Sequence, residues 1–255
     1  MEFSIVRDLL PICLTPPRRR SGIKIDKVIF LVAHDTGNVN STAKGNVQYY
    51  KDTYNKESAS AHLFVDNIDI IECIPAFQNP EKAWHVLYNI PIDNQVYGCD
   101  ANDCAIGIEL CIFDDKNKSQ LAYVKYVWTL AYLCDYYKLN PLKNIISHAK
   151  LDPTRRTDPI SGLAKSGHTY DQLINDVNSK FTQIQNAKIQ EANSIIKQES
   201  KPMEKSNEQI MGEIAIDKLV AKGFINTPDK WKSKDLKTET TPLWLLFHLA
   251  SLIDK

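Results

Sequence analysis

The sequence lacks any apolar stretch long enough to span a lipid bilayer. The longest candidate, residues 243–253, is too short and contains His248, whereas a spanning helix needs about 20 apolar residues. The N-terminus carries Glu2, Arg7 and Asp8 and shows no apolar segment followed by a small-residue cleavage site. We therefore expect no membrane span, and synthesis in the cytoplasm without a signal peptide.

The sequence also lacks an excess of charge of either sign. Its 31 Lys and Arg residues balance 31 Asp and Glu residues, so the overall charge indicates no nucleic-acid partner. One local exception is the run Arg18-Arg19-Arg20. It is typical of a solvated basic arm, and the alternative is a loop that meets an anionic substrate.

Cysteines at Cys-x-x-Cys spacing are absent as well, which gives no indication of a zinc ribbon or a thioredoxin motif. Of the six cysteines, Cys111 and Cys134 lie in apolar surroundings, where a free cysteine acts as a small hydrophobic residue. The even count permits disulfides, but the chain is too long and too regular for a disulfide-stapled mini-protein. We expect a reduced chain.

What is present is the composition of a globular protein, with 43% hydrophobic and 24% charged residues in 255. Residues 1–181 alternate strand and helix patterns. Residues 182–208 are rich in Gln, Asn, Lys, Glu and Ser, which predicts a polar, partly helical linker. Residues 209–255 predict a small helical domain, with a first helix ended by Gly223 and two Thr-Pro steps that begin further helices. That domain is marginal for an independent core, so we expect it to pack on the first domain or to self-associate.

The first domain is predicted to have an α/β fold, since apolar runs with β-branched residues alternate with segments of helical periodicity. Residues 75–103 are predicted to form a long loop. The predicted strands are 28–33, 59–66, 68–74, 104–112 and 144–147, and the predicted helices are 41–54, 119–139 and 169–181.

Two of the predicted strands end in a histidine. His34 follows the first buried strand and His148 follows the last. One histidine at a strand end is more often structural than a ligand, but two can converge on one metal ion. A third ligand is expected in the loop after His148, where Asp152 and Asp158 are candidates that spacing alone does not separate.

Glu109 interrupts an otherwise apolar strand, where an unpaired carboxylate is costly. It could lie at the rim of the sheet, or it could take a proton from a water molecule that a metal ion activates. Arg155 or Arg156 could stabilise the oxyanion of a tetrahedral intermediate. These parts fit metal-assisted hydrolysis of an amide.

Together these segments resemble the type 2 N-acetylmuramoyl-L-alanine amidases, zinc enzymes that include many phage endolysins and are related to peptidoglycan recognition proteins. The resemblance spans roughly residues 1–181 and implies a central mixed β-sheet flanked by helices. The matching segments are His34-Asp35-Thr36-Gly37-Asn38, residues 60–66, Ala83-Trp84-His85, Gly107-Ile108-Glu109-Leu110, and Ser147-His148 followed by Arg156-Thr157-Asp158-Pro159.

The resemblance also implies roles for single residues. Glu109 matches the catalytic glutamate, and Arg156 falls where the family usually has lysine. For His62 a structural role is favoured over a substrate contact, and Ala61 replaces a tyrosine that some relatives use. The implied zinc (Zn2+) ligands are His34, His148 and Asp158, the implied catalytic residues are Glu109 and Arg156, and the substrate-binding candidates are Thr36, Asn38, His62, Trp84 and His85.

The function implied by the resemblance is that of an endolysin, a peptidoglycan hydrolase that cleaves the amide between N-acetylmuramic acid and L-alanine with zinc-activated water. Such an enzyme acts at the bacterial cell wall after its release. Residues 209–255 resemble small helical domains that bind a secondary wall polymer, with homo-oligomer formation as the alternative. The rival functions are a non-catalytic peptidoglycan-binding module, which the three filled ligand positions disfavour, and an amidase that recycles muropeptides in the cytoplasm, which the C-terminal domain disfavours.

Overall fold

The computed structural model describes residues 3–199, 207–224 and 226. Its contacts divide the chain into two compact units, Met1–Ala192 and Asn193–Lys255. The predicted limits of domain, linker and C-terminal domain stay a prediction. The helices predicted to begin at the two Thr-Pro steps lie outside the described residues.

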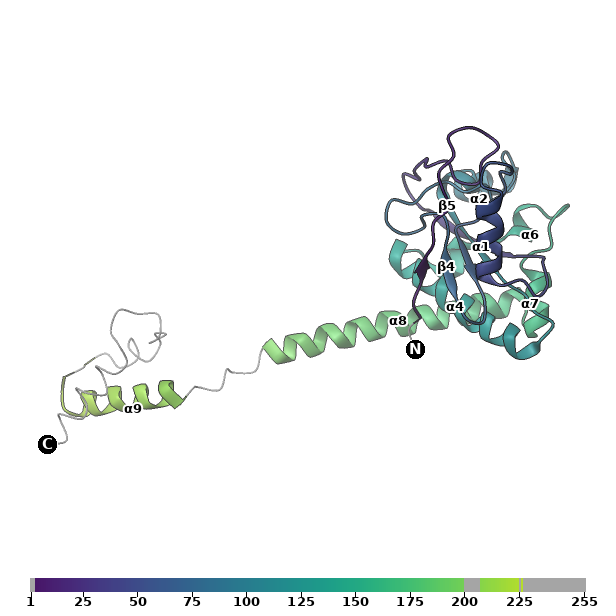
Figure 1. The fold of residues 1–255 in the computed structure, drawn as a ribbon. Coiled ribbons are helices and arrows are strands. Elements are labelled where there is room, and N and C mark those ends of the chain that lie inside the picture. Colours follow the sequence, from purple (N-terminus) through teal and green to yellow (C-terminus); the bar gives the residue numbers. More distant parts are fainter. Residues whose placement is uncertain (1–2, 200–206, 225, 227–255) are drawn as a thin grey trace. The chain divides into compact units, whose positions relative to one another are not determined.

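The first unit contains a mixed β-sheet, which confirms the predicted fold class (Figure 1). The strand order within the described residues is β1-β4-β3-β5-β2-β6. Strands β3 and β4 pair in antiparallel fashion, and the other neighbours are parallel. The strands are β1 (Val6–Arg7), β2 (Phe30–Asp35), β3 (Leu63–Val65), β4 (Ile70–Glu72), β5 (Ala105–Leu110) and β6 (Ile145–Ser147).

The helices begin and end largely at residues with known capping behaviour. The Asp115 side chain accepts hydrogen bonds from the first backbone N–H groups of α4, and Lys138 ends that helix in the left-handed region. The described helices are α1 (Ala43–Asp52), α2 (Pro91–Tyr97), α3 (Ala101–Cys104), α4 (Lys116–Tyr137), α5 (Pro141–Asn144), α6 (His148–Leu151), α7 (Ile160–Ser166), α8 (Tyr170–Glu199) and α9 (Asn207–Ala221).

The prediction of a long loop over residues 75–103 is wrong for its second half, whereas residues 75–90 contain no helix or strand. The segment contains α2, with Pro91 at its start and Gly98 in the left-handed region at its end, and most of α3, which is capped by Asp100. Both helices are too short to show an apolar period, so only their end signals mark them in the sequence. At the other end of the first unit, α8 continues to Glu199, into the segment predicted to be a partly helical linker.

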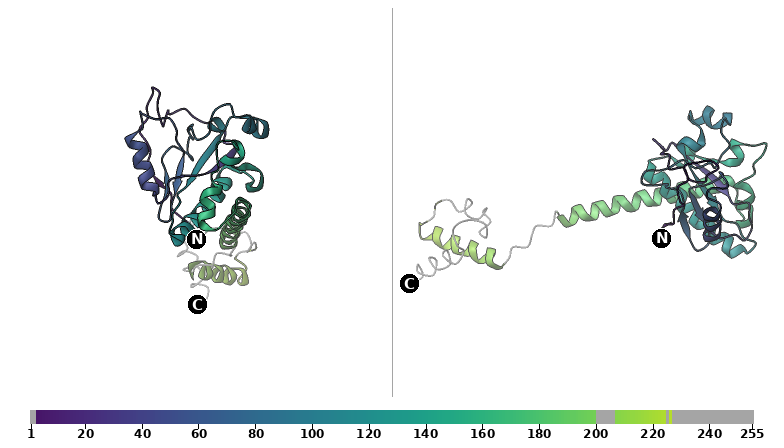
Figure 2. Two further views of the ribbon diagram at one scale, coloured as in Figure 1. Left: turned by 90° about the vertical axis from the view of Figure 1, so that its right-hand side faces the viewer. Right: turned by 45° about the horizontal axis from the view of Figure 1, so that its top comes forward.

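Helices flank the sheet (Figure 2). Apolar clusters lie on both of its faces, because successive residues of a strand point to opposite faces. Leu31 and Ala33 of β2 pack into the larger cluster, which includes residues of α4, while Phe30 and Val32 pack into a smaller cluster with α3 and α6. Each fully buried large apolar side chain contributes about 1.5–3 kcal/mol. The same alternation places His34, the next residue of this series, on the face of Phe30 and Val32.

The structure joins Cys99 to Cys104 in a disulfide, contrary to the expected reduced chain. The single turn of α3 brings the two Cα atoms to 6.4 Å, within the usual range for such a bond. The sequence spacing of these two residues did not indicate this pairing. The four other cysteines, at positions 13, 73, 111 and 134, are free.

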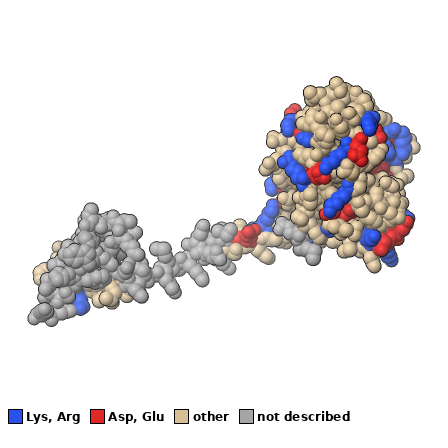
Figure 3. Space-filling model, viewed as in Figure 1, with Lys and Arg blue, Asp and Glu red and all other residues tan. Residues whose placement is uncertain are grey.

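In the second unit, the described part is mainly α9. Ala215, Ile216 and Leu219 are buried on one side of it, and Gly223 follows with a φ of +76°. The predicted helix and its terminal glycine are therefore present. Among the described helices, none combines the length and apolar character needed to cross a membrane. On the face of the first unit seen in Figure 3, basic and acidic side chains are interspersed.

Candidate active site

His34 and His148 are brought together by neighbouring parallel strands. Ala33 of β2 pairs with Ser147 of β6, so the residues that follow emerge side by side at the same edge of the sheet. Ser147 also caps α6, and its Oγ accepts a hydrogen bond from the N–H of Lys150. The two imidazole rings are both buried, with centroids 4.6 Å apart.

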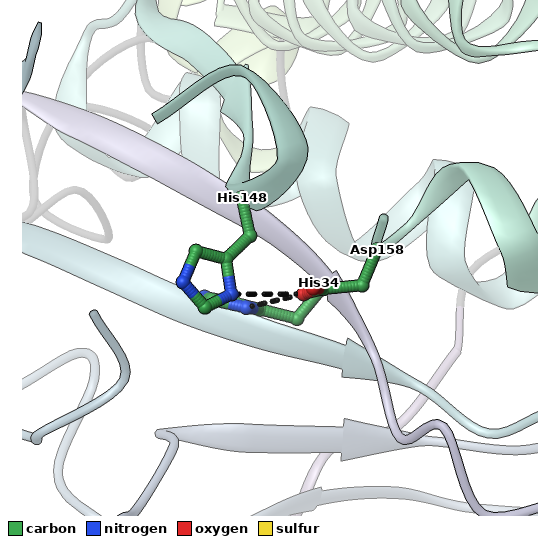
Figure 4. Close-up of side chains that lie close together, drawn as sticks. All are labelled: His34, His148 and Asp158. Atoms are coloured by element: carbon green, nitrogen blue, oxygen red, sulfur yellow. Dashed lines mark hydrogen bonds and ion pairs between the residues drawn. The ribbon is translucent and has the colours of Figure 1, made fainter. Parts of the chain in front are cut away.

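Asp158 joins the two histidines from the loop between α6 and α7 (Figure 4). Its Oδ2 lies 3.0 Å from Nδ1 of His34 and 3.0 Å from Nδ1 of His148. Asp152, the other candidate, pairs instead with Arg155. The structure therefore places Asp158 beside the histidines, a choice that spacing left open.

The three side chains form a set that fits a zinc ion. Their potential ligand atoms all lie within 4.8 Å of one another. Burial lowers the pKa of His34 to about 4, so its imidazole is neutral near pH 7, as metal binding requires. Burial raises the pKa of Asp158, but hydrogen bonds from His148 and His34 outweigh it and hold that pKa below its usual value. Two histidines and one carboxylate are typical of a catalytic zinc site with one open position.

Glu109 lies beside this set, because it pairs with His34 across β2 and β5. Its Oε2 is buried and has no hydrogen-bond partner among the described residues. Burial raises the pKa of Glu109 well above its usual value, and the carboxylates of Asp158 and Asp35 raise it further. A buried carboxylate with an unused oxygen beside a cavity is typical of a group that exchanges protons.

A cavity of about 780 Å³ opens above these residues. Tyr49, Tyr50 and Ser60 line it beside the predicted site residues. The predicted residues that line it are His34, Thr36, Asn38, Trp84, His85, Glu109, His148, Arg156 and Asp158. Arg156 is exposed, and its charge is close enough to Glu109 to lower the pKa of that carboxyl.

A protein-family model described as N-acetylmuramoyl-L-alanine amidase matches residues 25–161, the stretch that carries the whole constellation. The chain belongs to this amidase family. The match covers the strands β2 to β6 and ends at the start of α7.

Curated relatives are similar to part of this family member. Protein Ami of Listeria monocytogenes is 28% identical over an alignment of 172 residues, which covers 61% of this chain and 16% of that protein. The amidase BlyA of Bacillus subtilis is 26% identical over 152 residues, 58% of this chain and 40% of BlyA. The matched region therefore spans less than half of either relative.

Solved structures show the same fold. The Staphylococcus aureus hydrolase AmiA, solved with its ligand, aligns with a TM-score of 0.55 and 26% identity over 71% of this chain and 84% of that one. The catalytic domain of XlyA aligns with a TM-score of 0.52 and 21% identity over 69% and 99%. At 21% identity, the similarity to XlyA shows a shared fold only.

The structure corrects the inclusion of His62 among the substrate-binding candidates. His62 is fully buried and does not line the cavity. Its Nε2 donates to the carbonyl of Glu81 at 2.8 Å, and its Nδ1 accepts from the N–H of Gly107 at 3.0 Å. Both ring nitrogens of His62 therefore join neighbouring segments of the backbone. This is the structural role that the sequence analysis favours for His62.

Two residues that support the candidate site do not stand out in the sequence. The Oδ2 of Asp35 accepts hydrogen bonds from the N–H of Gly162 at 2.7 Å and from the hydroxyl of Ser161 at 2.9 Å. It thus fastens the start of α7, just after Asp158, to the end of β2. The hydroxyl of Tyr126 lies 3.0 Å from the carbonyl oxygen of His34. A buried tyrosine needs such a partner, but the sequence does not say which one.

Proposed function

We propose that the first unit is a zinc-dependent amidase that cleaves the bond between N-acetylmuramic acid and L-alanine in peptidoglycan. The observation that carries this proposal is the convergence of His34, His148 and Asp158 on one point at the floor of the cavity. Membership of the family supports the substrate class. The relative BlyA carries the name of this activity.

In this proposal His34, His148 and Asp158 would hold the metal, since their donor atoms lie close together. Zinc bound there would supply Lewis-acid activation of water and of the amide carbonyl. Asp35, through Ser161 and Gly162, keeps the loop of Asp158 against β2. These contacts preorganise the three side chains, so little ordering is needed when the ion binds.

Glu109 carries the proton in this proposal. As water adds to the carbonyl carbon, one carboxylate oxygen of Glu109 takes its proton. When the carbon–nitrogen bond breaks, the same group returns that proton to the amine of L-alanine. A pKa raised by burial and by the nearby carboxylates brings Glu109 closer to the operating pH, which favours both transfers.

Arg156 supplies the positive charge for the developing oxyanion. It lines the cavity on the loop that leads to Asp158, and its side chain is exposed. The guanidinium replaces the ammonium of the lysine that is usual in the family, and its planar fork constrains the direction of its hydrogen bonds more strongly. Thr36, Asn38, Trp84 and the rest of the cavity wall would contact the sugar and the peptide.

The wider role that we propose is that of an endolysin, which acts on the bacterial wall after release from the cytoplasm. The resemblance to a family with many phage endolysins supports this role. In this proposal, residues 209–255 would bind a secondary wall polymer or form a homo-oligomer.

Digestion of purified cell walls tests the activity. We expect the wild-type chain to release new L-alanine amino termini without new reducing sugars, and the His34→Ala variant to release neither. The matched control is His168→Ala, since His168 does not line the cavity and stacks on Tyr123 instead; it should retain activity. New reducing ends from the wild type would indicate a glycosidase and refute the amidase.

A further inference from the structure

The second ring nitrogen of His34 faces another histidine. Its Nε2 lies 3.0 Å from Nδ1 of His85, and the two rings are nearly perpendicular, at 88°. If Nδ1 of His34 binds a cation beside Asp158, the ring proton of His34 must lie on Nε2. Nε2–H then donates to His85, whose Nδ1 must be the unprotonated acceptor and whose own proton lies on Nε2.

His85 is fixed in place from two sides. Its backbone N–H donates to Oδ1 of Asn102 at 2.9 Å, and the N–H of Val86 donates to the same oxygen at 3.0 Å. Nδ2 of the same buried asparagine donates to the carbonyl of Val86 at 2.7 Å. α3 therefore holds the backbone that carries this imidazole.

The ring of His85 also lies directly against strand β5. A Cβ atom at Gly107 would stand only 2.7 Å from Cγ and Nδ1 of His85, closer than real Cβ contacts. The absence of a side chain at Gly107 thus makes room for the ring between β5 and His34. This explains the presence of a glycine in the interior of β5.

We propose that His85 is a positioning residue, which holds His34 in the orientation and tautomer that present Nδ1 to the metal. The proposal rests on the zinc site of the proposed function. It differs from the substrate contact expected for His85, because the residue acts through His34. Partners of this kind orient metal-binding histidines, and their loss typically weakens metal affinity by about 10–100-fold.

A matched pair of variants tests whether the acceptor atom matters. In His85→Asn, the side-chain Oδ1 can stand where Nδ1 stood and can accept the same hydrogen bond, whereas His85→Leu has similar bulk and no acceptor. We expect the zinc Kd, measured by competition with a chromophoric chelator, to rise about 10–100-fold in His85→Leu. His85→Asn should stay within about threefold of the wild type, since it keeps the acceptor.

The control pair is His168→Asn and His168→Leu, at a histidine outside the cavity whose Nδ1 bonds to Ser166. Both should bind zinc as the wild type does. Equal zinc affinities of the two His85 variants would overturn the proposal, whether both are weakened or neither is. If the wild-type chain itself binds no zinc, the proposed function fails instead, so the two failures are distinguishable.

A measurement on the unaltered chain covers the case in which His85→Leu does not fold. In ¹⁵N–¹H correlation spectra of the imidazole rings of the zinc-loaded wild type, we expect His34 to carry its proton on Nε2. His85 should be neutral, with its proton also on Nε2. A metal-bound Nε2 on His34, or a proton on Nδ1 of His85, would contradict the assignment.

Discussion

At the scale of single residues, the site depends on groups whose hydrogen-bonding capacity is not fully used. Oε2 of Glu109 and Nε2 of His148 are buried and have no hydrogen-bond partner among the described residues. Leaving such atoms unpaired costs about 1–3 kcal/mol each. That cost is typical of sites where a substrate or an ion completes the bonding.

Replacement of Glu109 by glutamine tests its role in proton transfer. The Glu109→Gln variant keeps the volume of the side chain and removes the carboxylate. We expect kcat to fall by about 10²–10⁴-fold, measured as the release of L-alanine amino termini from walls.

The zinc content of Glu109→Gln should match that of the wild type, because Glu109 is not among the three converging donors. This separates the variant from His34→Ala, which should lose both zinc and activity. Retention of more than about a tenth of the wild-type kcat would mean that another group carries the proton.

At the scale of strands and helices, the sequence predicts those features of the site that follow from local patterns of apolar and polar residues. Both histidines were found because each follows a short apolar strand, and parallel neighbours end at the same edge. The choice of Asp158 over Asp152 could not be made in this way, because it depends on how Arg155 and the α6–α7 loop fold back. The hydrogen bonds from His85 and Val86 to Asn102 of α3 could not be predicted either, because no local sequence pattern connects these two segments.

His62 offers a test of how the strands are held together. It bridges the carbonyl of Glu81 and the N–H of Gly107 in its neutral form, and burial lowers its pKa from 6.5 to about 4. The unfolded chain therefore binds a proton at His62 below about pH 6.5, whereas the folded chain does so only near pH 4. The stability that this group contributes is fully present above about pH 6.5 and is lost as the pH falls toward 4.

Urea unfolding of the metal-free chain at pH 7 and pH 5 measures this loss. The contribution of His62 corresponds to a decrease of about 2 kcal/mol in the free energy of unfolding between these pH values. In His62→Gln, which does not titrate, the decrease from pH 7 to pH 5 should be smaller by that amount, whatever the absolute stability of the variant. An equal decrease in both proteins would show that His62 is already charged in the folded state.

At the scale of the whole molecule, the residues assigned to chemistry all lie in the first unit. The nine that line the cavity fall between positions 34 and 158. The first unit extends along α8, where Gln185 and Lys188 both bind the carboxylate of Asp135. A chain that ends at residue 192 therefore keeps every described contact around the cavity.

We expect a chain truncated after residue 192 to hydrolyse soluble muramyl peptides at the rate of the full chain, because its site is intact. Its binding to intact walls should be at least about tenfold weaker, since truncation removes the second binding module that we propose for residues 209–255 and with it the gain from linked sites. Pull-down with purified walls and hydrolysis of a soluble substrate measure the two properties separately. A cooperative thermal transition of the truncated chain serves as the control for folding, and unchanged wall binding would assign the affinity to the amidase unit alone.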